Sequence, residues 1–564
     1  MNLLLINGFW MPSQIIDEFL THSQLDSNIS LTFPLSIMTI AGWCRQELPT
    51  ANIEVIDFMA ELHKFISNTL ILPTDFNSFA TGHLLKNSFT PDYIGISVSS
   101  SNGYNANLKL LAICKQLFPN SKIIIGGMHA TTFTKSFIGK AGVDYIIRGA
   151  GDIAFTDLLK CLIKNQSPLH IAGVVNSTDN IASLSPPLTD LDAIPQYPYD
   201  LIDMEYLITK DDTSPIMQEG ARTGMVMTSR GCPFTCTYCS ASQIHSRKVA
   251  FHTVERVIKE IKYLLDTFKI NQICIMDDLF GANKKLFFNL FKAIDEEKLK
   301  FKIVIPAGLS LKLYNQEMLD ILIAHGVESA YFPLESGSQY VQDHIINKHI
   351  KLSEAIKLIK YAKDKKLFTG INIVIGSPNE TKDMMYETYQ FLKKLPVDWI
   401  QFFSAYPYPG TEMTNILLNR QDLTEDTLIN IWDTSTQGFK KRSFDTVEIK
   451  GEELAELVYD FNIQLNFFNN YNMRVGDFIT PVTKFSKIIE RYPYHIIAIL
   501  CRAKCYYEQN LIDNAEQDIE DAVTTIKQSK ESEQMFTKYR DNIIRLFSPY
   551  GIKQIIELYN STNQ

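Results

Sequence analysis

The sequence predicts an α/β protein with an amino-terminal doubly wound, Rossmann-like domain, a partial (β/α)6 barrel and a helical carboxy-terminal domain. Short apolar runs alternate with helical periods from residue 1 to about residue 163, which is typical of crossover units on a parallel sheet. The alternation returns at residue 224 and stops before residue 424. We therefore expect domains at 1–173, 224–423 and 424–564, with a linker at 174–223.

Length, composition and charge limit the class of protein. A chain of 564 residues exceeds what one hydrophobic core usually supports, and 45% hydrophobic with 21% charged residues is ordinary for a folded protein. The net charge of −9 argues against a nucleic-acid partner. No uncharged apolar run reaches the roughly 20 residues of a membrane span, and residues 1–7 lack the features of a signal peptide. We expect no membrane contact and a cytoplasmic location.

Glycines follow two predicted strands of the amino-terminal domain. Gly126 and Gly127 end one apolar run, and Gly149 and Gly151 follow the next one along the chain. In doubly wound sheets this carboxyl edge binds ligands, and glycine lets the backbone approach them closely. The pattern alone fits a phosphate or nucleotide site as well as a large flat ligand.

A proline-rich linker leads into six strand-and-helix units, which predict a partial or complete barrel. The expected strands are 224–228, 272–276, 302–306, 329–333, 369–375 and 399–403, and the expected helices are 253–265, 284–296, 316–324, 352–365 and 382–395.

Beyond residue 424 the pattern predicts helices only. Segments 451–468, 496–509 and 514–528 are amphipathic, and the pair between 494 and 526 faintly resembles a single tetratricopeptide unit. One copy does not bury its own faces, so no repeat array is predicted. We expect these helices to cap a cavity and select the substrate, or to serve a structural or docking role.

One cysteine cluster carries the chemistry. Cys232, Cys236 and Cys239 lie within eight residues on the loop after the first barrel strand. Three thiolates this close suit a four-iron cluster, which leaves one iron open to a cofactor or substrate. The alternatives are a structural zinc site, with His245 as the nearest fourth ligand, and three cysteines without a shared metal. Cys274 lies mid-strand and is expected in the core.

This CxxxCxxC loop resembles the signature of the radical S-adenosylmethionine superfamily. The resemblance implies that Cys232, Cys236 and Cys239 bind a [4Fe–4S] cluster, and that Tyr238 lies beside the adenine of S-adenosylmethionine. The open iron would chelate the cofactor, whose reductive cleavage releases a 5′-deoxyadenosyl radical. An external electron donor such as flavodoxin or ferredoxin is implied as well.

Other strand ends resemble the cofactor contacts of that superfamily. The resemblance implies that Asp277 contacts the methionyl amine, that Glu335 and Ser336 contact polar atoms, and that the strand with Ile373 and Gly376 supports the adenine. Asp278 serves this site or caps the next helix, and Asn379 replaces the glycine of the usual Gly-x-Pro-Gly-Glu turn.

The amino-terminal third resembles the cobalamin-binding domain that precedes the radical core in one subfamily. The contacts implied for cobalamin are Ser97, Ser99, Gly126, Gly127, His129, Gly149, Gly151 and Asp152. His129 is expected as a polar loop residue with a contact to the nucleotide tail, not as a cobalt ligand. The usual Gly-Glu-Gly-Glu is here Gly149-Ala150-Gly151-Asp152, which loses one carboxylate.

Together these resemblances imply a cobalamin-dependent radical S-adenosylmethionine enzyme. The implied activity is methylation of an unactivated carbon of a small-molecule or peptide substrate through methylcobalamin and a 5′-deoxyadenosyl radical. Two alternatives stay open: ring contraction or cyclisation without methyl transfer, and a cluster-containing cofactor-binding or sensing module. No catalytic base is identified.

Overall fold

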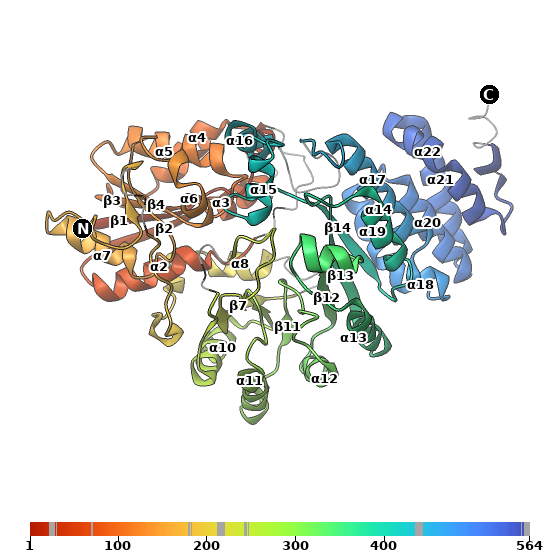
Figure 1. Ribbon diagram of the computed structural model, residues 1–564, viewed down its shortest axis with the longest axis horizontal. Helices are drawn as coiled ribbons and strands as arrows, with labels where there is room; N and C mark the ends of the chain where they lie inside the picture. Colours follow the sequence, from red (N-terminus) through yellow and green to blue (C-terminus); the bar gives the residue numbers. More distant parts are fainter. Residues whose placement is uncertain are drawn as a thin grey trace.

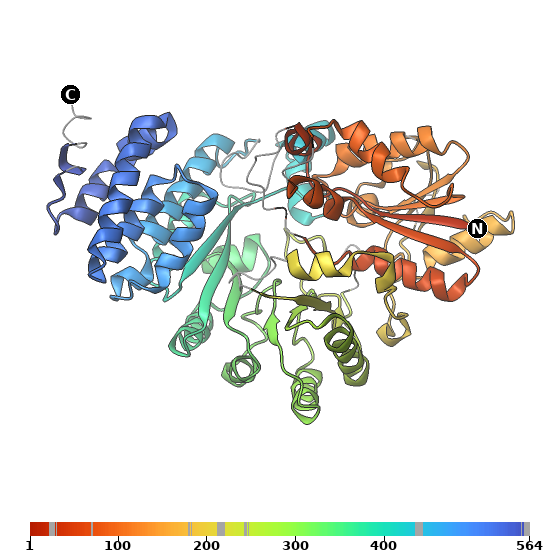
Figure 2. The same ribbon diagram turned by 180° about the vertical axis from the view of Figure 1, so that it is seen from behind.

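A computed structural model gives the arrangement of the chain (Figures 1 and 2). It describes residues 1–21, 29, 31–68, 72–140, 142–178, 181, 183–210, 220–241, 245, 247–434, 444–553 and 555–557. In both views the amino-terminal domain lies at one end, the carboxy-terminal helices lie at the other, and an arc of strands with helices outside it joins them. The predicted fold class is confirmed.

The amino-terminal domain is a six-stranded sheet in the order β2-β1-β3-β4-β5-β6. Five strands are parallel, and β6 pairs antiparallel with β5. Leu4 and Leu5 of β1 point to opposite faces of the sheet and are both fully buried, so both faces are covered. The strands are β1 (Asn2–Asn7), β2 (Asn52–Asp57), β3 (Tyr93–Ser97), β4 (Lys122–Gly126), β5 (Val143–Ile147) and β6 (Val174–Val175).

Seven helices cover this sheet among the described residues. Asp57 ends β2 and caps the next helix by accepting from the backbone N–H of Met59 and Ala60. The helices are α1 (Ser13–Thr21), α2 (Leu35–Glu47), α3 (Phe58–Ile66), α4 (Phe76–Leu84), α5 (Tyr104–Leu117), α6 (Met128–Thr132) and α7 (Ala154–Ile163), and α8 (Met204–Lys210) follows in the linker.

Six parallel strands form the partial barrel as two three-stranded sheets, β11-β10-β7 and β12-β13-β14. Across the gap, the N–H of Leu309 donates to the Tyr331 carbonyl at 2.7 Å. The predicted units are confirmed: strands β7 (Thr223–Val226), β10 (Gln272–Ile275), β11 (Lys302–Val304), β12 (Ser329–Glu335), β13 (Phe368–Ile375) and β14 (Trp399–Ser404), with helices α10 (Val254–Phe268), α11 (Lys284–Glu296), α12 (Gln316–Ala324), α13 (Leu352–Asp364) and α14 (Lys382–Leu392).

The remaining helices divide into two groups. The first, α15 (Glu412–Asn419) and α16 (Glu425–Thr434), packs toward the amino-terminal domain, where α16 contacts α1 and α5. The second has a core of its own, which includes Leu500, Ile519 and Phe536. Its helices are α17 (Gly451–Ile463), α18 (Tyr471–Arg474), α19 (Thr480–Arg491), α20 (Ile496–Glu508), α21 (Ile512–Gln528) and α22 (Lys530–Phe547).

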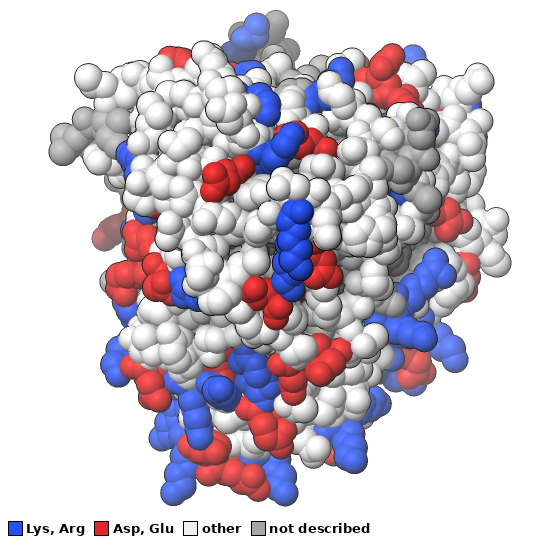
Figure 3. Space-filling view, turned by 90° about the vertical axis from the view of Figure 1, so that its left-hand side faces the viewer, with Lys and Arg blue, Asp and Glu red and all other residues white. Residues whose placement is uncertain are grey.

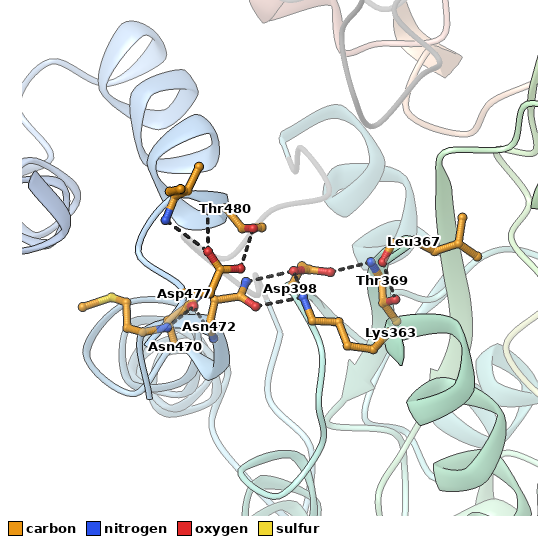
Figure 4. Close-up of polar contacts among 10 residues, drawn as sticks. Lys363, Leu367, Thr369, Asp398, Asn470, Asn472, Asp477 and Thr480 are labelled. Atoms are coloured by element: carbon orange, nitrogen blue, oxygen red, sulfur yellow. Dashed lines mark hydrogen bonds and ion pairs between the residues drawn. The ribbon is translucent and has the colours of Figure 1, made fainter. Parts of the chain in front are cut away.

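The second group attaches to the barrel along β14 and at its base. The side-chain amide of Asn466, just after α17, pairs with the N–H and carbonyl of Ile400 at 2.8 and 2.7 Å, as a neighbouring strand would. Figure 4 shows the base: buried Asp398 precedes β14 and accepts from Lys363, from Asn472 and from the N–H of Thr369.

These contacts lie at the amino ends of β13 and β14, whereas the cysteine loop follows the carboxyl end of β7. Helices α18 and α19 are therefore not placed to cap a cavity beside the cysteines, and their contacts fit the structural alternative. Helix α16, which belongs to the same carboxy-terminal segment, instead packs in one apolar cluster with Tyr238 of the cysteine loop. No helix of the described residues is long and apolar enough to cross a membrane.

Candidate functional site

The cysteine loop begins at a short hairpin beyond β7. Strands β8 (Ser229–Arg230) and β9 (Ala250–Phe251) pair antiparallel, so Arg230 has a fixed backbone position. Gly231 then turns the chain with φ of +107°, a value that favours glycine, and its N–H donates to Asp278 at 2.8 Å. The turn sends Cys232 over the carboxyl end of the barrel.

The loop is also held from the opposite side of the barrel. The N–H and hydroxyl of Thr237 donate to the carbonyls of Ile346 and Ile345 at 3.1 and 3.0 Å. The amide of Asn347 donates to the hydroxyl of Thr235 at 2.7 Å. These partners follow β12, so two distant segments fix the spacing of the three thiols.

The three cysteines are free thiols, two half-buried and one, Cys239, exposed. Burial raises the pKa of the two half-buried thiols, and the charge of Lys348 opposes this at Cys236. No group of three or more Cys, His, Asp or Glu side chains in the described part converges on one metal ion. A zinc site requires such convergence, whereas cubane thiolates each bind a different iron, so this donor set fits the cluster.

The other candidate ligands have different partners. The Nδ1 atom of His245 lies 2.6 Å from a carboxylate oxygen of Asp278. Cys274 is fully buried in β10, and its thiol donates to the sulfur of Met276 at 3.6 Å. This core position of Cys274 is the one expected from the sequence.

A buried cation joins two of the predicted cofactor contacts. The ammonium of Lys348 lies 2.7 Å from Glu335 and donates to the Tyr238 hydroxyl at 3.2 Å. Glu335 has φ of +71° and lies at a register shift between β12 and β13, a bulge that re-aims its side chain. Burial and the charge of Glu335 raise the pKa of Tyr238. The structure therefore brings Tyr238 and Glu335 together through Lys348.

Asp277 and Asp278 both brace the loop. Asp277 is 2% exposed and accepts from the N–H and hydroxyl of Thr228 and from the hydroxyl of Ser229; burial raises its pKa to about 6. Asp278 accepts from Gly231 and pairs with His245. The capping alternative for Asp278 is wrong, because Asn283 caps α11.

Other predicted contacts lie in the packing around the site. The hydroxyl of Ser336 is buried and lies 3.0 Å from that of Thr388 on α14. Ile373 is fully buried in the main core, and the N–H of Gly376 donates to Glu380 at 2.7 Å. Ser336 and Ile373 therefore present no side chain to a ligand, and β13 offers its backbone.

One polar atom of β13 has no partner among the described residues. The Oδ1 atom of Asn372 is buried without a hydrogen bond. Asn372 lies two positions before Val374, which packs in the same apolar cluster as Tyr238. An unpaired acceptor on this face fits a bound ligand with hydroxyl or amino donors, as S-adenosylmethionine has.

The turn after β13 survives the loss of its usual glycine. Asn379 has φ of +72°, the left-handed conformation that asparagine tolerates better than most residues. Its N–H donates to Glu448 and its side-chain oxygen accepts from Arg420. Asn379 therefore adopts here the left-handed conformation for which glycine is usually needed.

The carboxyl edge of the amino-terminal sheet has its own geometry. Ser97 is buried with its carbonyl bonded to the N–H of Gly8, and Ser99 is exposed. A Cβ on Gly126 would meet nothing nearer than the Ile147 carbonyl oxygen at 3.7 Å. An open edge of this kind fits a large flat ligand such as cobalamin.

At two of these positions, contacts within the chain itself explain why the residue is glycine. A Cβ on Gly127 would lie 2.6 Å from the carbonyl oxygen of Val98, and one on Gly149 would lie 2.6 Å from that of Ser185. Both have positive φ. Close approach of the backbone is sufficient to explain glycine at these two positions. At Gly151 a Cβ would approach Ile40 at 3.1 Å.

His129 is not the polar loop residue expected. It lies in α6, fully buried, with Nδ1 2.8 Å from the Ser101 hydroxyl and Nε2 unpartnered among the described residues. Trp432 of α16 meets its ring edge-on at 5.0 Å. Burial lowers the pKa of His129 to about 3, so the ring is neutral.

Two polar contacts join the amino-terminal edge to the barrel. The guanidinium of Arg230 contacts both carboxylate oxygens of Asp152 at 2.8 and 2.9 Å. The hydroxyl of Tyr406, after β14, donates to Asn102 at 2.7 Å. The cysteine loop and the predicted cobalamin edge are thus neighbours.

Comparisons with known proteins agree with this geometry. Residues 226–392 match the Radical SAM superfamily and residues 81–159 match the B12 binding domain. An uncharacterized methyltransferase of Pyrococcus horikoshii is 30% identical over 67% of this chain and 77% of its own length. The chain belongs to the cobalamin-dependent radical S-adenosylmethionine enzymes. Its cofactors are a [4Fe–4S] cluster, S-adenosylmethionine and cobalamin.

Other relatives of this radical enzyme are more distant. Cytidylyl-2-hydroxyethylphosphonate methyltransferase of Streptomyces wedmorensis is 27% identical over 67% of this chain and 75% of its own length. An anaerobic magnesium-protoporphyrin IX monomethyl ester cyclase of Cereibacter sphaeroides is 24% identical over 57% of this chain and 52% of its own length. The solved structure of the cobalamin-dependent radical enzyme OxsB shares the fold, with a TM-score of 0.62, 15% identity and coverage of 100% of this chain and 80% of that one.

Sequence reasoning missed three residues of this radical enzyme's site. Lys348, Asn372 and Arg230 reach it only through the fold, since a lysine after a strand or an arginine before a loop is ordinary surface composition. Arg230 had one signal, its place beside the cysteine motif. Each of these residues has its role because the tertiary fold buries it beside groups that are distant in the sequence.

Proposed function

We propose that this enzyme methylates an unactivated carbon of a small-molecule or peptide substrate. The single observation that carries the proposal is that the cysteine loop and the carboxyl edge of the amino-terminal sheet adjoin, through Arg230 and Asp152. When bound, the cluster and S-adenosylmethionine supply a radical and cobalamin supplies a methyl group. Methyl transfer requires both at one cavity.

The chain's own residues bind, orient and exclude water. In the proposal Cys232, Cys236 and Cys239 hold the cluster, and Tyr238 and Glu335, linked by Lys348, line the S-adenosylmethionine site. Asp277 and Ser336 act indirectly, because their polar atoms are engaged by Thr228, Ser229 and Thr388.

The backbone of β13 at Ile373 and Gly376 supports the adenine in this proposal. An apolar cluster with Leu417, Leu428 and Trp432 lies next to Tyr238. That cluster keeps water from a radical, which is the protein's main task in such chemistry.

At the cobalamin edge, Ser99, Gly126 and the turn with Gly151 are proposed contacts. Ser97, Gly127 and Gly149 shape the edge from beneath, and His129 supports it from the core. Asp152 acts through its pair with Arg230.

The experiment uses full-length enzyme purified without oxygen and reconstituted with iron, sulfide and hydroxocobalamin. Reductant and methyl-labelled S-adenosylmethionine are added, and methylcobalamin and 5′-deoxyadenosine are followed by mass spectrometry. We expect labelled methylcobalamin and 5′-deoxyadenosine, with the latter lost in Cys236→Ala. Absence of labelled methylcobalamin from enzyme that retains both cofactors would contradict methylation.

Ring closure is the second candidate, because one relative is named as a cyclase. It predicts 5′-deoxyadenosine with bound cobalamin and no labelled methylcobalamin. The two candidates therefore differ in one measured product.

We propose an external electron donor and no nucleic-acid partner. The net charge is −9, and on the face in Figure 3 Lys and Arg are interspersed with Asp and Glu, without a continuous basic area. A tRNA-2-methylthio-N(6)-dimethylallyladenosine synthase, 24% identical over 43% of this chain, is nevertheless a relative, so RNA binding is worth measuring by filter retention. A cytoplasmic location stays a prediction.

A further inference from the structure

Arg230 and Asp152 form a buried ion pair between the two cofactor-binding parts of the chain. Their side chains are 11% and 8% exposed, and one guanidinium nitrogen contacts both carboxylate oxygens. Asp152 closes the turn after β5, at the carboxyl edge of the amino-terminal sheet. Arg230 stands two residues before Cys232.

Arg230 lies in the short segment that leads from the β8–β9 hairpin into the cysteine loop. Its backbone pairs with Ala250, and the next residue, Gly231, is held by Asp278. A cluster bound by Cys232 restrains the chain at the other end of this short segment. Arg230 already meets Asp152, and loading the cluster would hold it there more firmly.

An unpaired carboxylate at the position of Asp152 is unfavourable, because burial removes its water. When Arg230 is displaced, the turn Gly149-Ala150-Gly151-Asp152 must open or leave that charge uncompensated. The shape of the cobalamin edge thus depends on the order of the cysteine loop, and the dependence is reciprocal.

We propose that the Arg230–Asp152 pair couples the two sites, so that the cluster on the cysteine loop tightens cobalamin binding. The proposal rests on the cofactors of the proposed function and not on methyl transfer. Arg230 and Asp152 are positioning residues.

The test is a thermodynamic cycle with hydroxocobalamin as the probe. Its dissociation constant is measured by absorbance titration for full-length protein with the cluster and after removal of iron. We expect at least fivefold tighter binding with the cluster, the range of ordinary coupling between sites. Asp152→Asn keeps the side-chain volume and loses the charge. In this variant we expect the dissociation constants with and without the cluster to differ by less than twofold.

Two further variants separate coupling from general damage. Arg230→Gln leaves Asp152 in place and should also bring the ratio of the two dissociation constants below twofold. Arg230→Lys keeps a positive charge and should retain part of the difference in affinity. Asp200→Asn removes a carboxylate from an exposed pair with Arg45 and should keep the fivefold ratio. Equal affinity in wild type with and without cluster, or a fivefold ratio in Asp152→Asn or Arg230→Gln, would overturn the proposal. Because the experiment measures hydroxocobalamin binding, it tests the coupling even if the enzyme does not methylate.

Discussion

The ammonium of Lys348 lies 2.7 Å from the carboxylate of Glu335, and both side chains are about nine-tenths buried. The two residues are thirteen positions apart in the sequence. The segment between them carries Ile345 and Ile346, whose carbonyls hold Thr237 of the cysteine loop. One short segment therefore sets both the loop and the charge pair beside it.

Replacing Lys348 should damage cofactor cleavage before it damages the cluster. Lys348→Met leaves Glu335 buried without a partner, which costs about 3 kcal/mol and turns the carboxylate toward water. We expect 5′-deoxyadenosine formation to fall at least tenfold with iron content unchanged, and Lys348→Arg to recover part of it. Lys357→Met, in an exposed pair with Glu354 at 3.0 Å, is the control and should behave as wild type. Equal activity of Lys348→Met and wild type would contradict this role.

The three motif cysteines should be separable from the other thiols by iron analysis. Alanine at Cys232, Cys236 or Cys239 should abolish the visible charge-transfer absorbance of the iron–sulfur cluster and lower the iron content. Cys161→Ala, in α7 of the other domain, should retain full iron content. Retention of a complete cluster in any of the three motif variants would exclude that thiol as a ligand.

The fold was largely predictable because its signals are local. Helices 284–296 and 316–324 have the bounds that the sequence predicts. Their apolar spacing is a local signal, and the residues that cap them, Asn283 and Asn315, directly precede them in the chain. The cysteine motif was predictable for the same reason. Spacing alone indicates three thiols on one loop.

The site beyond the cysteines was less predictable because its partners are distant. Asp277 is a carboxylate at the strand end where one is expected. Only the fold shows that the hydroxyls of Thr228 and Ser229 donate hydrogen bonds to it. Glycine at position 149 indicates that some group approaches the backbone closely, but the sequence does not show which group. In the structure it is the backbone of Ser185 in the linker.

Asn466 should matter for stability far more than a helix-end asparagine usually does. Its amide serves both backbone groups of Ile400 on the edge strand β14, and Asn466→Leu leaves these buried groups unpaired, at about 2–4 kcal/mol. Urea unfolding measures the loss. Among the described residues the side-chain amide of Asn469 bonds only the Gln464 side chain, so Asn469→Leu should cost less than about 1 kcal/mol. Similar losses in both variants would show that the strand edge tolerates water.

His129 should make the protein sensitive to mild acid. Its pKa is about 3 in the folded chain, below the usual 6.5, so between pH 6.5 and 3 the unfolded state binds a proton that the folded state does not. Stability is therefore lost as pH falls through this window, by about 2 kcal/mol between pH 7 and pH 5 from this residue alone. Urea unfolding of cofactor-free protein at both pH values should show that difference between wild type and His129→Asn, because the packing cost of the substitution is the same at each pH. Parallel pH dependence in the two proteins would mean that the imidazole beside Trp432 accepts a proton within the fold.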